Sequence, residues 1–251
     1  MQDSFEAGYV TLAGNDGDEI EAYAAVRADS SPTGGVVVIH HMPGFDRASK
    51  EITCRFAAMG YSAVCPNLYH RVAPGADPDD AAAAARAAGG VSDEQLVGDV
   101  SGARDHLRAL PSSNGKVGVI GHCSGGRQSM LAACSLPMDA AVDCYGAFVL
   151  SSPPAEHPLS IGPITDLLPK LACPVLGLFG EEDKYPSPDE VAELDTLLTA
   201  QGTPHDFHSF EGAGHAFFAV DRPSYRPAAA VEGWGYIRDF LAQHLAADAS
   251  S

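Results

Sequence analysis

Residues 116–127 read K-V-G-V-I-G-H-C-S-G-G-R, and this stretch indicates the fold class. A β-branched apolar run ends in Gly121, Cys123 follows, and Gly125 stands two residues further on. The run is typical of a buried strand, and the R-Q-S-M-L-A-A-C-S-L after it predicts a helix that Pro137 ends. Glycines on both sides of a central residue permit a sharp strand-to-helix turn around a strained nucleophile. The stretch therefore predicts a nucleophile elbow, with cysteine where serine is usual.

Two other interpretations of this stretch stay open at this point. One is a buried cysteine in an ordinary glycine-rich loop, and the other is a loop that cradles phosphate at a helix N-terminus. A phosphate loop needs a lysine or a longer glycine pattern, and neither is present. The strand–turn–helix context favours the elbow over both alternatives.

Composition narrows the class of protein. The chain has 251 residues, 45% of them hydrophobic, which suffices for one core, so we expect a single domain over residues 1–251. Its net charge of −18 argues against nucleic acid and anionic membranes as partners. We identify no signal peptide and no apolar stretch of membrane-spanning length. The 6 cysteines are scattered rather than closely paired, which is typical of a reducing compartment, so we expect a cytoplasmic protein.

Apolar runs alternate with helical patterns along the chain, which predicts an α/β fold with a mostly parallel sheet and helices on both faces. The predicted strands are 20–27, 35–40, 62–66, 116–121, 140–145, 174–180 and 206–210. The predicted helices are 48–59, 93–110, 124–136, 188–201 and 228–246, with a short alanine-rich helix within 79–90. Capping boxes mark two of the starts, at Ser92-x-x-Gln95 and Ser187-x-x-Glu190.

The last helix carries a stripe that we expect to face the sheet, formed by Val231, Trp234, Ile237, Leu241 and Leu245. The proline-rich segment 151–158 reads S-S-P-P-A-E-H-P and predicts an exposed connection that lies over the site. It is too short for a lid domain.

A cysteine nucleophile needs a base, because a thiol at neutral pH is mostly protonated. In the hydrolase fold the chain order is nucleophile, acid, base. Asp183 follows the strand 174–180 and is the best acid, with Glu181 and Glu182 as competitors.

His215 follows the next strand in a loop bracketed by Gly212 and Gly214, which makes it the best base. The spacing of His205 and His208 puts them on opposite faces of a strand, which argues against a metal pair. Cys123, Asp183 and His215 therefore form the predicted catalytic triad.

An acyl-transfer site also needs two donors for the oxyanion. One is the backbone N–H of Ser124, directly after the nucleophile. The other comes from the loop after the strand 35–40, which reads H-H-M-P-G, and the Met42 N–H is the candidate.

Taken together, these segments resemble the dienelactone hydrolase family over nearly the whole chain. The resemblance rests on H-H-M-P-G (40–44), A-V-C-P-N-L-Y (63–69), G-H-C-S-G-G (121–126), G-E-E-D-K-Y-P-S-P (180–188) and G-A-G-H-A-F-F (212–218). It implies a lidless α/β-hydrolase domain without cofactor or metal. The type activity opens carboxymethylenebutenolide, a dienelactone, to maleylacetate in the degradation of aromatic compounds.

The resemblance also implies residue roles. Cys123 is the nucleophile, Asp183 orients the base, His215 is the base, and Arg86 stands where the family binds the substrate carboxylate. The glutamate that helps to activate the thiol is His41 here, which would form a thiolate–imidazolium pair or donate a hydrogen bond.

The second clamp arginine of the family is Ala219 here, and Arg222 is the candidate substitute, with a surface loop arginine as an equal alternative. We group Tyr145 with His41, Arg86 and Arg222 as substrate-binding or thiol-tuning residues.

The sequence thus predicts a cysteine hydrolase of small, carboxylate-bearing lactones or esters, present as a monomer or small homo-oligomer. The alternatives are a short-chain carboxylesterase or thioesterase on the same triad, and a small-molecule receptor that keeps the triad only as a pocket. A thiol redox protein is a third class, which normally needs a resolving cysteine, and no C-x-x-C spacing is present.

Overall fold

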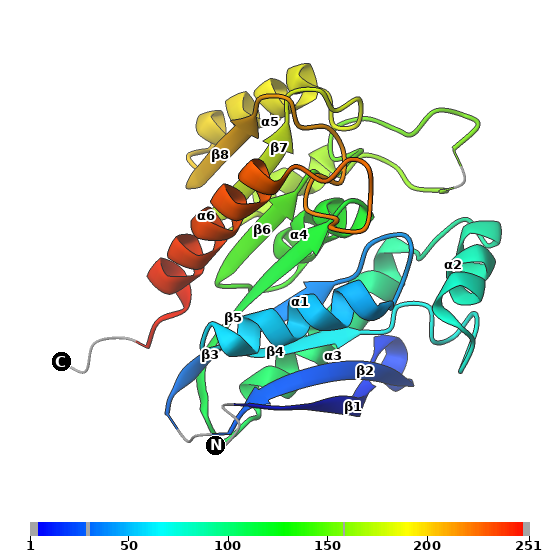
Figure 1. Ribbon diagram of the computed structural model, residues 1–251, viewed down its shortest axis with the longest axis vertical. Helices are drawn as coiled ribbons and strands as arrows, with labels where there is room; N and C mark the ends of the chain where they lie inside the picture. Colours follow the sequence, from blue (N-terminus) through cyan, green and yellow to red (C-terminus); the bar gives the residue numbers. More distant parts are fainter. Residues whose placement is uncertain (1–4, 29–30, 158, 248–251) are drawn as a thin grey trace.

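A computed structural model describes residues 5–28, 31–157 and 159–247. Its centre is an 8-stranded sheet in the order β1-β2-β4-β3-β5-β6-β7-β8 (Figure 1). The pairs β1–β2 and β2–β4 are antiparallel, and all the others are parallel. The strands are β1 (Phe5–Ala13), β2 (Glu19–Arg27), β3 (Thr33–Ile39), β4 (Ser62–Pro66), β5 (Ser113–His122), β6 (Ala140–Cys144), β7 (Val175–Gly180) and β8 (His205–Phe210).

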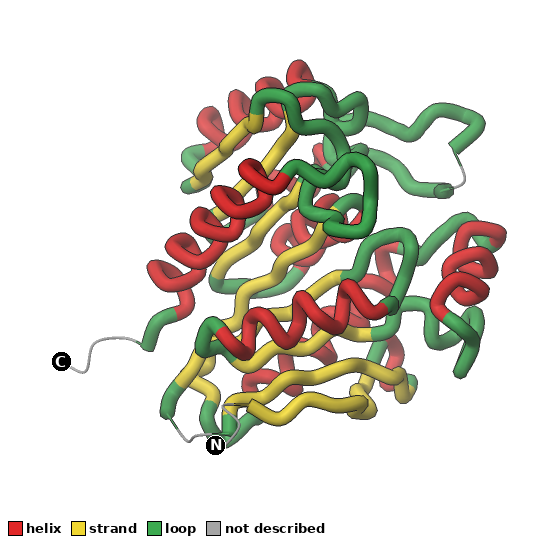
Figure 2. Tube along the Cα trace, in the orientation of Figure 1, coloured by secondary structure: helices red, strands yellow, loops and turns green. Residues whose placement is uncertain are grey.

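Helices cover both faces of this sheet (Figures 1 and 2). Helices α1 and α6 pack on one face, whereas α3, α4 and α5 contribute to the core on the other. The helices are α1 (Arg47–Ala58), α2 (Pro78–Ala87), α3 (Asp93–Arg108), α4 (Ser124–Ser135), α5 (Pro188–Gln201) and α6 (Pro227–Leu245), with the short 3-10 helices η1 (Asn15–Gly17) and η2 (Thr165–Lys170).

The apolar run of β3 is buried on both faces, which explains its lack of polar alternation. Val37 and Ile39 belong to the core beneath α3 and α4, while Val36 and Val38 belong to the core beneath α1 and α6. Successive side chains of a strand point to opposite faces, so a central parallel strand needs apolar residues at every position.

The serines of both predicted capping boxes cap helix starts, whereas the Gln95 and Glu190 side chains bond to other segments instead of closing the box. The Ser92 hydroxyl accepts the Gln95 N–H at 3.2 Å and begins α3, and the Ser187 hydroxyl accepts the Glu190 N–H at 3.2 Å and begins α5. These side chains satisfy backbone donors that have no partner inside the helix, which fixes where each helix begins.

Two details differ from the sequence analysis. The edge strand β1 was not predicted, because most of its side chains are exposed or half-buried and leave no strong apolar pattern. Val231 was placed on the sheet-facing stripe of α6, but it is 72% exposed. Residues 227–230 form the first turn, and it is Ala229 and Ala230 that are buried there.

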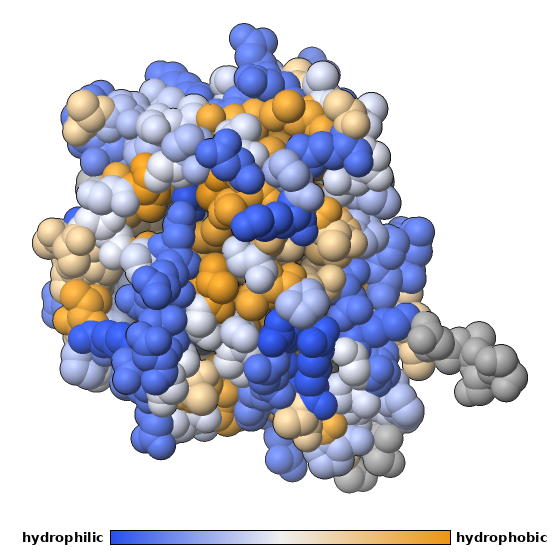
Figure 3. All heavy atoms as spheres, turned by 180° about the vertical axis from the view of Figure 1, so that it is seen from behind, coloured by the Kyte–Doolittle hydropathy of each residue, from blue (hydrophilic) through white to orange (hydrophobic). Residues whose placement is uncertain are grey.

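The carboxyl ends of the parallel strands bring the predicted site residues to one edge of the sheet. Cys123 follows β5, Asp183 follows β7, and His215 follows β8. This sheet order, with the elbow after β5 and helices on both faces, confirms the α/β-hydrolase fold. No described helix is long and apolar enough to cross a membrane. Hydrophilic residues cover much of the face shown in Figure 3, and apolar residues gather at its centre.

Candidate active site

Cys123 adopts a strained backbone at the turn between β5 and α4. Its φ is 58° and its ψ is −123°, a combination that lies outside the left-handed helical region and is rare for any residue with a Cβ. The Cys123 N–H donates to the Cys144 carbonyl at 3.0 Å, and the Gly126 N–H donates to the Cys123 carbonyl at 2.9 Å. These bonds hold the strained residue between β6 and the first turn of α4.

The flanking glycines are required by close backbone packing. A Cβ on Gly121 would collide with the Gly125 carbonyl oxygen, and a Cβ on Gly125 would lie 2.6 Å from the Ile39 carbonyl oxygen. Both contacts are with backbone, which cannot rotate away as a side chain can. The turn therefore has the geometry that the glycine pattern predicted.

Asp183 and His215 lie together at the same edge. The His215 Nδ1 is 2.8 Å from the Asp183 Oδ2, and Asp183 is buried. Since the Asp183 carboxylate accepts the hydrogen bond from His215 Nδ1–H, the Nε2 of His215 is left for other partners.

The pKa of His215 is raised to about 10. Burial lowers it, but the hydrogen bond to Asp183 and the interaction with the Cys123 sulfur raise it by more. The protonated imidazole is thus stabilised between a carboxylate and a thiol. The ring of Tyr145 packs edge-on against His215, with 5.2 Å between ring centroids, so Tyr145 helps to fix the imidazole.

Cys123 and His215 open into a cavity of about 260 Å³. Its lining is mostly apolar and consists of Met42, Cys123, Ser124, Ala147, Phe148, His157, Leu159, Ile161, Tyr185 and His215. The segment between β6 and η2 contributes several of these residues, so this proline-rich connection does lie beside the site. Sequence reasoning named the segment but not Phe148, Leu159, Ile161 or Tyr185, because apolar residues in a loop carry no signal of what they face.

Met42 and Ser124, whose backbone N–H groups are the predicted oxyanion donors, also line this cavity. Within the described residues, neither N–H donates a hydrogen bond. Two unused donors beside a nucleophile are what an oxyanion requires.

His41, which the sequence suggested as a partner of the Cys123 thiol, pairs with Asp46 instead. Its Nε2 is 2.7 Å from Asp46 Oδ2, and it does not line the cavity. Burial by itself would raise the pKa of Asp46. The hydrogen bonds from His41 and Ser49 outweigh this effect and lower the pKa to about 2. In the described chain no hydrogen bond joins His41 to Cys123.

The adjacent His122 is buried, and its pKa is lowered to about 3 by burial and by the nearby His41 and Arg55. It is neutral and packs on the rings of Tyr145, Phe218 and Trp234.

The two candidate clamp arginines do not line the cavity. Arg86 is half-buried on α2 beside Tyr69, whose hydroxyl donates to the Met42 carbonyl at 2.9 Å. Burial raises the pKa of Tyr69 to about 12 although the charge of Arg86 lowers it. Arg222 is exposed in the loop before α6.

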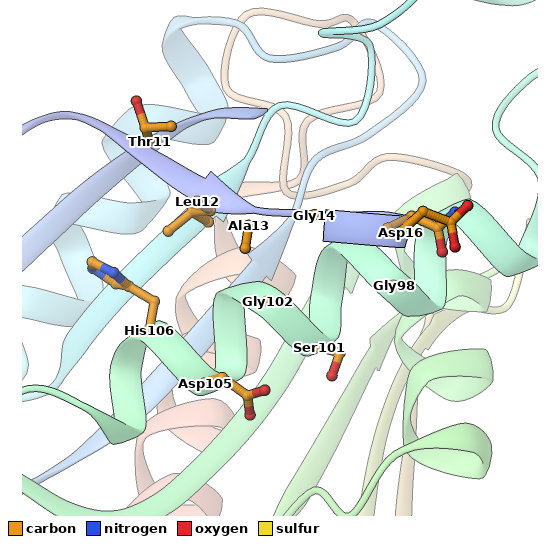
Figure 4. A pocket seen from close by; sticks show the side chains of 11 residues that line it. Thr11, Leu12, Ala13, Gly14, Asp16, Gly98, Ser101, Gly102, Asp105 and His106 are labelled. Carbon is orange, nitrogen blue, oxygen red and sulfur yellow. The ribbon is translucent and has the colours of Figure 1, made fainter. Parts of the chain in front are cut away.

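A larger cavity of about 510 Å³ lies beside the edge strand of the sheet, between β1 and α3. Its polar side chains include Asp16, Asp105 and His106, and Figure 4 shows Asp16 and His106 at opposite ends of it. Among the residues that the structure describes, no three His, Cys, Asp or Glu side chains are grouped as metal ligands.

The fold is that of an α/β hydrolase, and Cys123, Asp183 and His215 lie at the carboxyl edge of its sheet. The family model described as "Dienelactone hydrolase family" matches residues 20–245. The chain therefore belongs to the dienelactone hydrolase family.

Similar proteins support this membership. A Salmonella typhimurium protein named "Putative carboxymethylenebutenolidase" is 33% identical over 249 residues, which cover 94% of this chain and 87% of that protein. The carboxymethylenebutenolidase of Pseudomonas putida is 31% identical over 218 residues, covering 84% and 86%. The crystal structure of "Putative Dienelactone Hydrolase" from Klebsiella pneumoniae aligns with a TM-score of 0.83 at 27% identity, over 96% of this chain and all of that one.

Proposed function

We propose that this protein is a cysteine hydrolase of small esters or lactones, in which Cys123 is the nucleophile and His215 and Asp183 are its base and orienting acid. The observation that carries the proposal is the strained backbone of Cys123 beside the His215–Asp183 pair. Such strain persists only where surrounding structure enforces it, and it clusters at active sites. The dipole of α4, which begins at Ser124, further favours a negative charge on the sulfur.

The first half of the proposed reaction is acylation. The Cys123 sulfur bonds to the carbonyl carbon, and the electron pair of the C=O bond moves to oxygen, where the N–H groups of Met42 and Ser124 hold it. When the C=O bond reforms, the ester C–O bond breaks, and the leaving oxygen takes the proton from His215 Nε2. The Asp183 carboxylate keeps the imidazole oriented through Nδ1.

The second half is deacylation. In the thioester the sulfur carries no negative charge, so one interaction that raises the pKa of His215 is lost. Neutral His215 can then accept a proton from water, whose oxygen bonds to the acyl carbon while the C–S bond breaks. The thiolate and the protonated histidine are thereby restored.

Two substrate classes follow from different observations. The names of the relatives favour a carboxylate-bearing lactone of the dienelactone type, which Arg86 would have to bind by turning from Tyr69 toward the cavity. The lining favours a neutral short-chain ester, because no lysine or arginine is among the described residues that line the main cavity. Rates of wild type and Arg86→Ala on dienelactone and on p-nitrophenyl butyrate separate the two classes, since only carboxylate binding needs the guanidinium.

The test of the nucleophile is hydrolysis of p-nitrophenyl butyrate by Cys123→Ala. We expect kcat/KM to fall by at least about 10³-fold, because the alanine variant lacks the sulfur that would form the covalent intermediate. Cys54→Ala, which removes another half-buried free thiol, is the matched control and should retain full activity.

Intact-mass measurement of His215→Ala after mixing with ester should show an accumulated acyl adduct on Cys123, because deacylation lacks its base. Full activity in Cys123→Ala would overturn the assignment. Peroxide reduction that survives in His215→Ala while ester hydrolysis is absent would favour a thiol redox protein instead.

A further inference from the structure

A second, smaller cavity adjoins the main one. It shares Met42, Ser124, Leu159 and Ile161 with it but is not lined by Cys123 or His215. Its volume is about 20 Å³, which is room for one water-sized group. Its polar lining comes from Arg127 and Gln128, in the first turns of α4, together with Ser124 and Tyr69.

The Arg127 guanidinium is fully buried and already neutralised. Its Nη1 and Nη2 donate to the Asp93 carboxylate at 3.0 and 3.1 Å, and Nη2 also donates to the Gly162 carbonyl at 2.7 Å. The remaining Nε–H has no partner within the described chain.

Gln128 presents the complementary atom. Its Oε1 is likewise buried and has no hydrogen-bond partner among the described residues. One cavity is thus lined by two side chains that carry a buried donor and a buried acceptor, both unused. Each unpaired buried polar group is costly, so the pair is suited to a group that satisfies both.

We propose that this small cavity is a specificity subsite for a neutral hydroxyl group of the substrate. A hydroxyl accepts one hydrogen bond and donates another, so it can accept from Arg127 Nε–H and donate to Gln128 Oε1 at once. A methyl group leaves both atoms unpaired. A carboxylate meets the Gln128 carbonyl oxygen and loses its hydration beside an arginine whose charge Asp93 already balances.

The position of the cavity assigns the hydroxyl to the acyl part of the substrate, and this step rests on the proposed function. His215 must reach the leaving oxygen, so the alcohol part occupies the region that His215 lines. The small cavity lies past Met42 and Ser124, whose N–H groups would hold the carbonyl oxygen, and it lacks His215. Only the acyl chain can extend there.

The test compares p-nitrophenyl esters that differ only at the far end of the acyl chain. Chains of several lengths end in methyl, hydroxyl or carboxylate, and kcat/KM is measured for each. We expect the hydroxyl ester of the best length to react about tenfold faster than its methyl and carboxylate counterparts, the effect of a hydrogen bond to a charged donor. Equal rates, or a preference for carboxylate, would overturn the subsite. Failure to hydrolyse any ester would instead contradict the proposed hydrolase.

Two substitutions then locate the preference. Gln128→Met removes the acceptor at similar volume, and Arg127→Lys removes the Nε–H while keeping a positive charge for Asp93. In each, the ratio of hydroxyl to methyl rates should fall toward one. Gln201→Met, the same substitution at the exposed end of α5, should keep the wild-type ratio.

Thermal melting identifies a variant that fails to fold. If Arg127→Lys fails to fold, the rate ratio of Gln128→Met alone tests the subsite. A ratio that stays unchanged in a folded Gln128→Met would refute the proposal.

Discussion

The cavity at the elbow and the groove between β1 and α3 share close glycine packing but differ in backbone strain and in the arrangement of their polar groups. Both depend on glycines that allow one backbone to touch another: Gly125 lies against the Ile39 carbonyl, and Gly102 lies against the Ala13 carbonyl. The groove is the larger, at about 510 Å³ against about 260 Å³. Size and close glycine packing therefore do not distinguish a site from a structural contact.

Backbone strain and convergence of polar groups do distinguish them. Cys123 has φ 58° and ψ −123°, whereas Asp16 in the groove has φ 55° and ψ 17°, a left-handed conformation that aspartate tolerates. At the elbow a carboxylate, an imidazole and a thiol interact in sequence. In the groove the polar side chains are spread along its length (Figure 4). This contrast supports placing the proposed chemistry at the elbow rather than in the groove.

The largest expected effect is on the orienting acid. Asp183→Asn should lower kcat/KM for p-nitrophenyl butyrate by about 10³-fold, because the amide cannot stabilise the imidazolium or hold its tautomer. Asp105→Asn in the groove is the matched control and should change the rate by less than about twofold. Comparable losses in both variants would break the contrast between the two regions.

The next effect concerns the elbow backbone. Gly121→Ala should lower the free energy of unfolding by about 3 kcal/mol or more, since its Cβ would collide with the Gly125 carbonyl. Gly235→Ala in α6 is the control, because no atom lies near its added Cβ, and it should be neutral or stabilising by up to about 1 kcal/mol. Urea denaturation measures both. A stable, active Gly121→Ala would show that the turn can relax.

The two histidines should respond to pH with opposite sign. The pKa of His215 is raised from 6.5 to about 10, so the folded state keeps a proton that the unfolded state loses. Its stabilising contribution is complete below pH 6.5 and decreases as the pH rises to about 10. Burial lowers the pKa of His106 in the groove below 6.5, so its contribution is complete above pH 6.5 and decreases as the pH falls through that value.

Stability differences between wild type and His215→Gln, and between wild type and His106→Gln, measured from pH 5 to pH 10.5, test these directions. Slopes of the same sign for both histidines would contradict the assigned environments.

The smallest effect is expected for the groove itself. The double variant Asp16→Asn, His106→Gln should keep ester hydrolysis within about twofold and stability within about 0.5 kcal/mol, as is usual for exposed or half-buried polar positions. A large loss of activity would mean that the groove takes part in function.

Features of this protein that depend on local patterns could be predicted from the sequence. The glycines around Cys123 indicated the turn, the capping serines marked helix starts, and the chain order Cys123, Asp183, His215 indicated which residues meet at the carboxyl edge of a parallel sheet. These features can be predicted because backbone sterics and strand periodicity act over a few residues. The edge strand β1 escaped prediction because its exposed side chains carry no such periodicity.

The surroundings of the Cys123 thiol, in contrast, became apparent from the folded structure. It pairs His41 with Asp46, leaves Arg222 exposed, and brings Leu159 and Ile161 to the cavity from a loop. It also neutralises Arg127 with Asp93, which precedes it by 34 positions. Such pairings depend on which segments the sheet order brings into contact, and no local pattern encodes them. The proposed nucleophile could therefore be predicted from the chain, whereas the polarity of the cavity beside it could not.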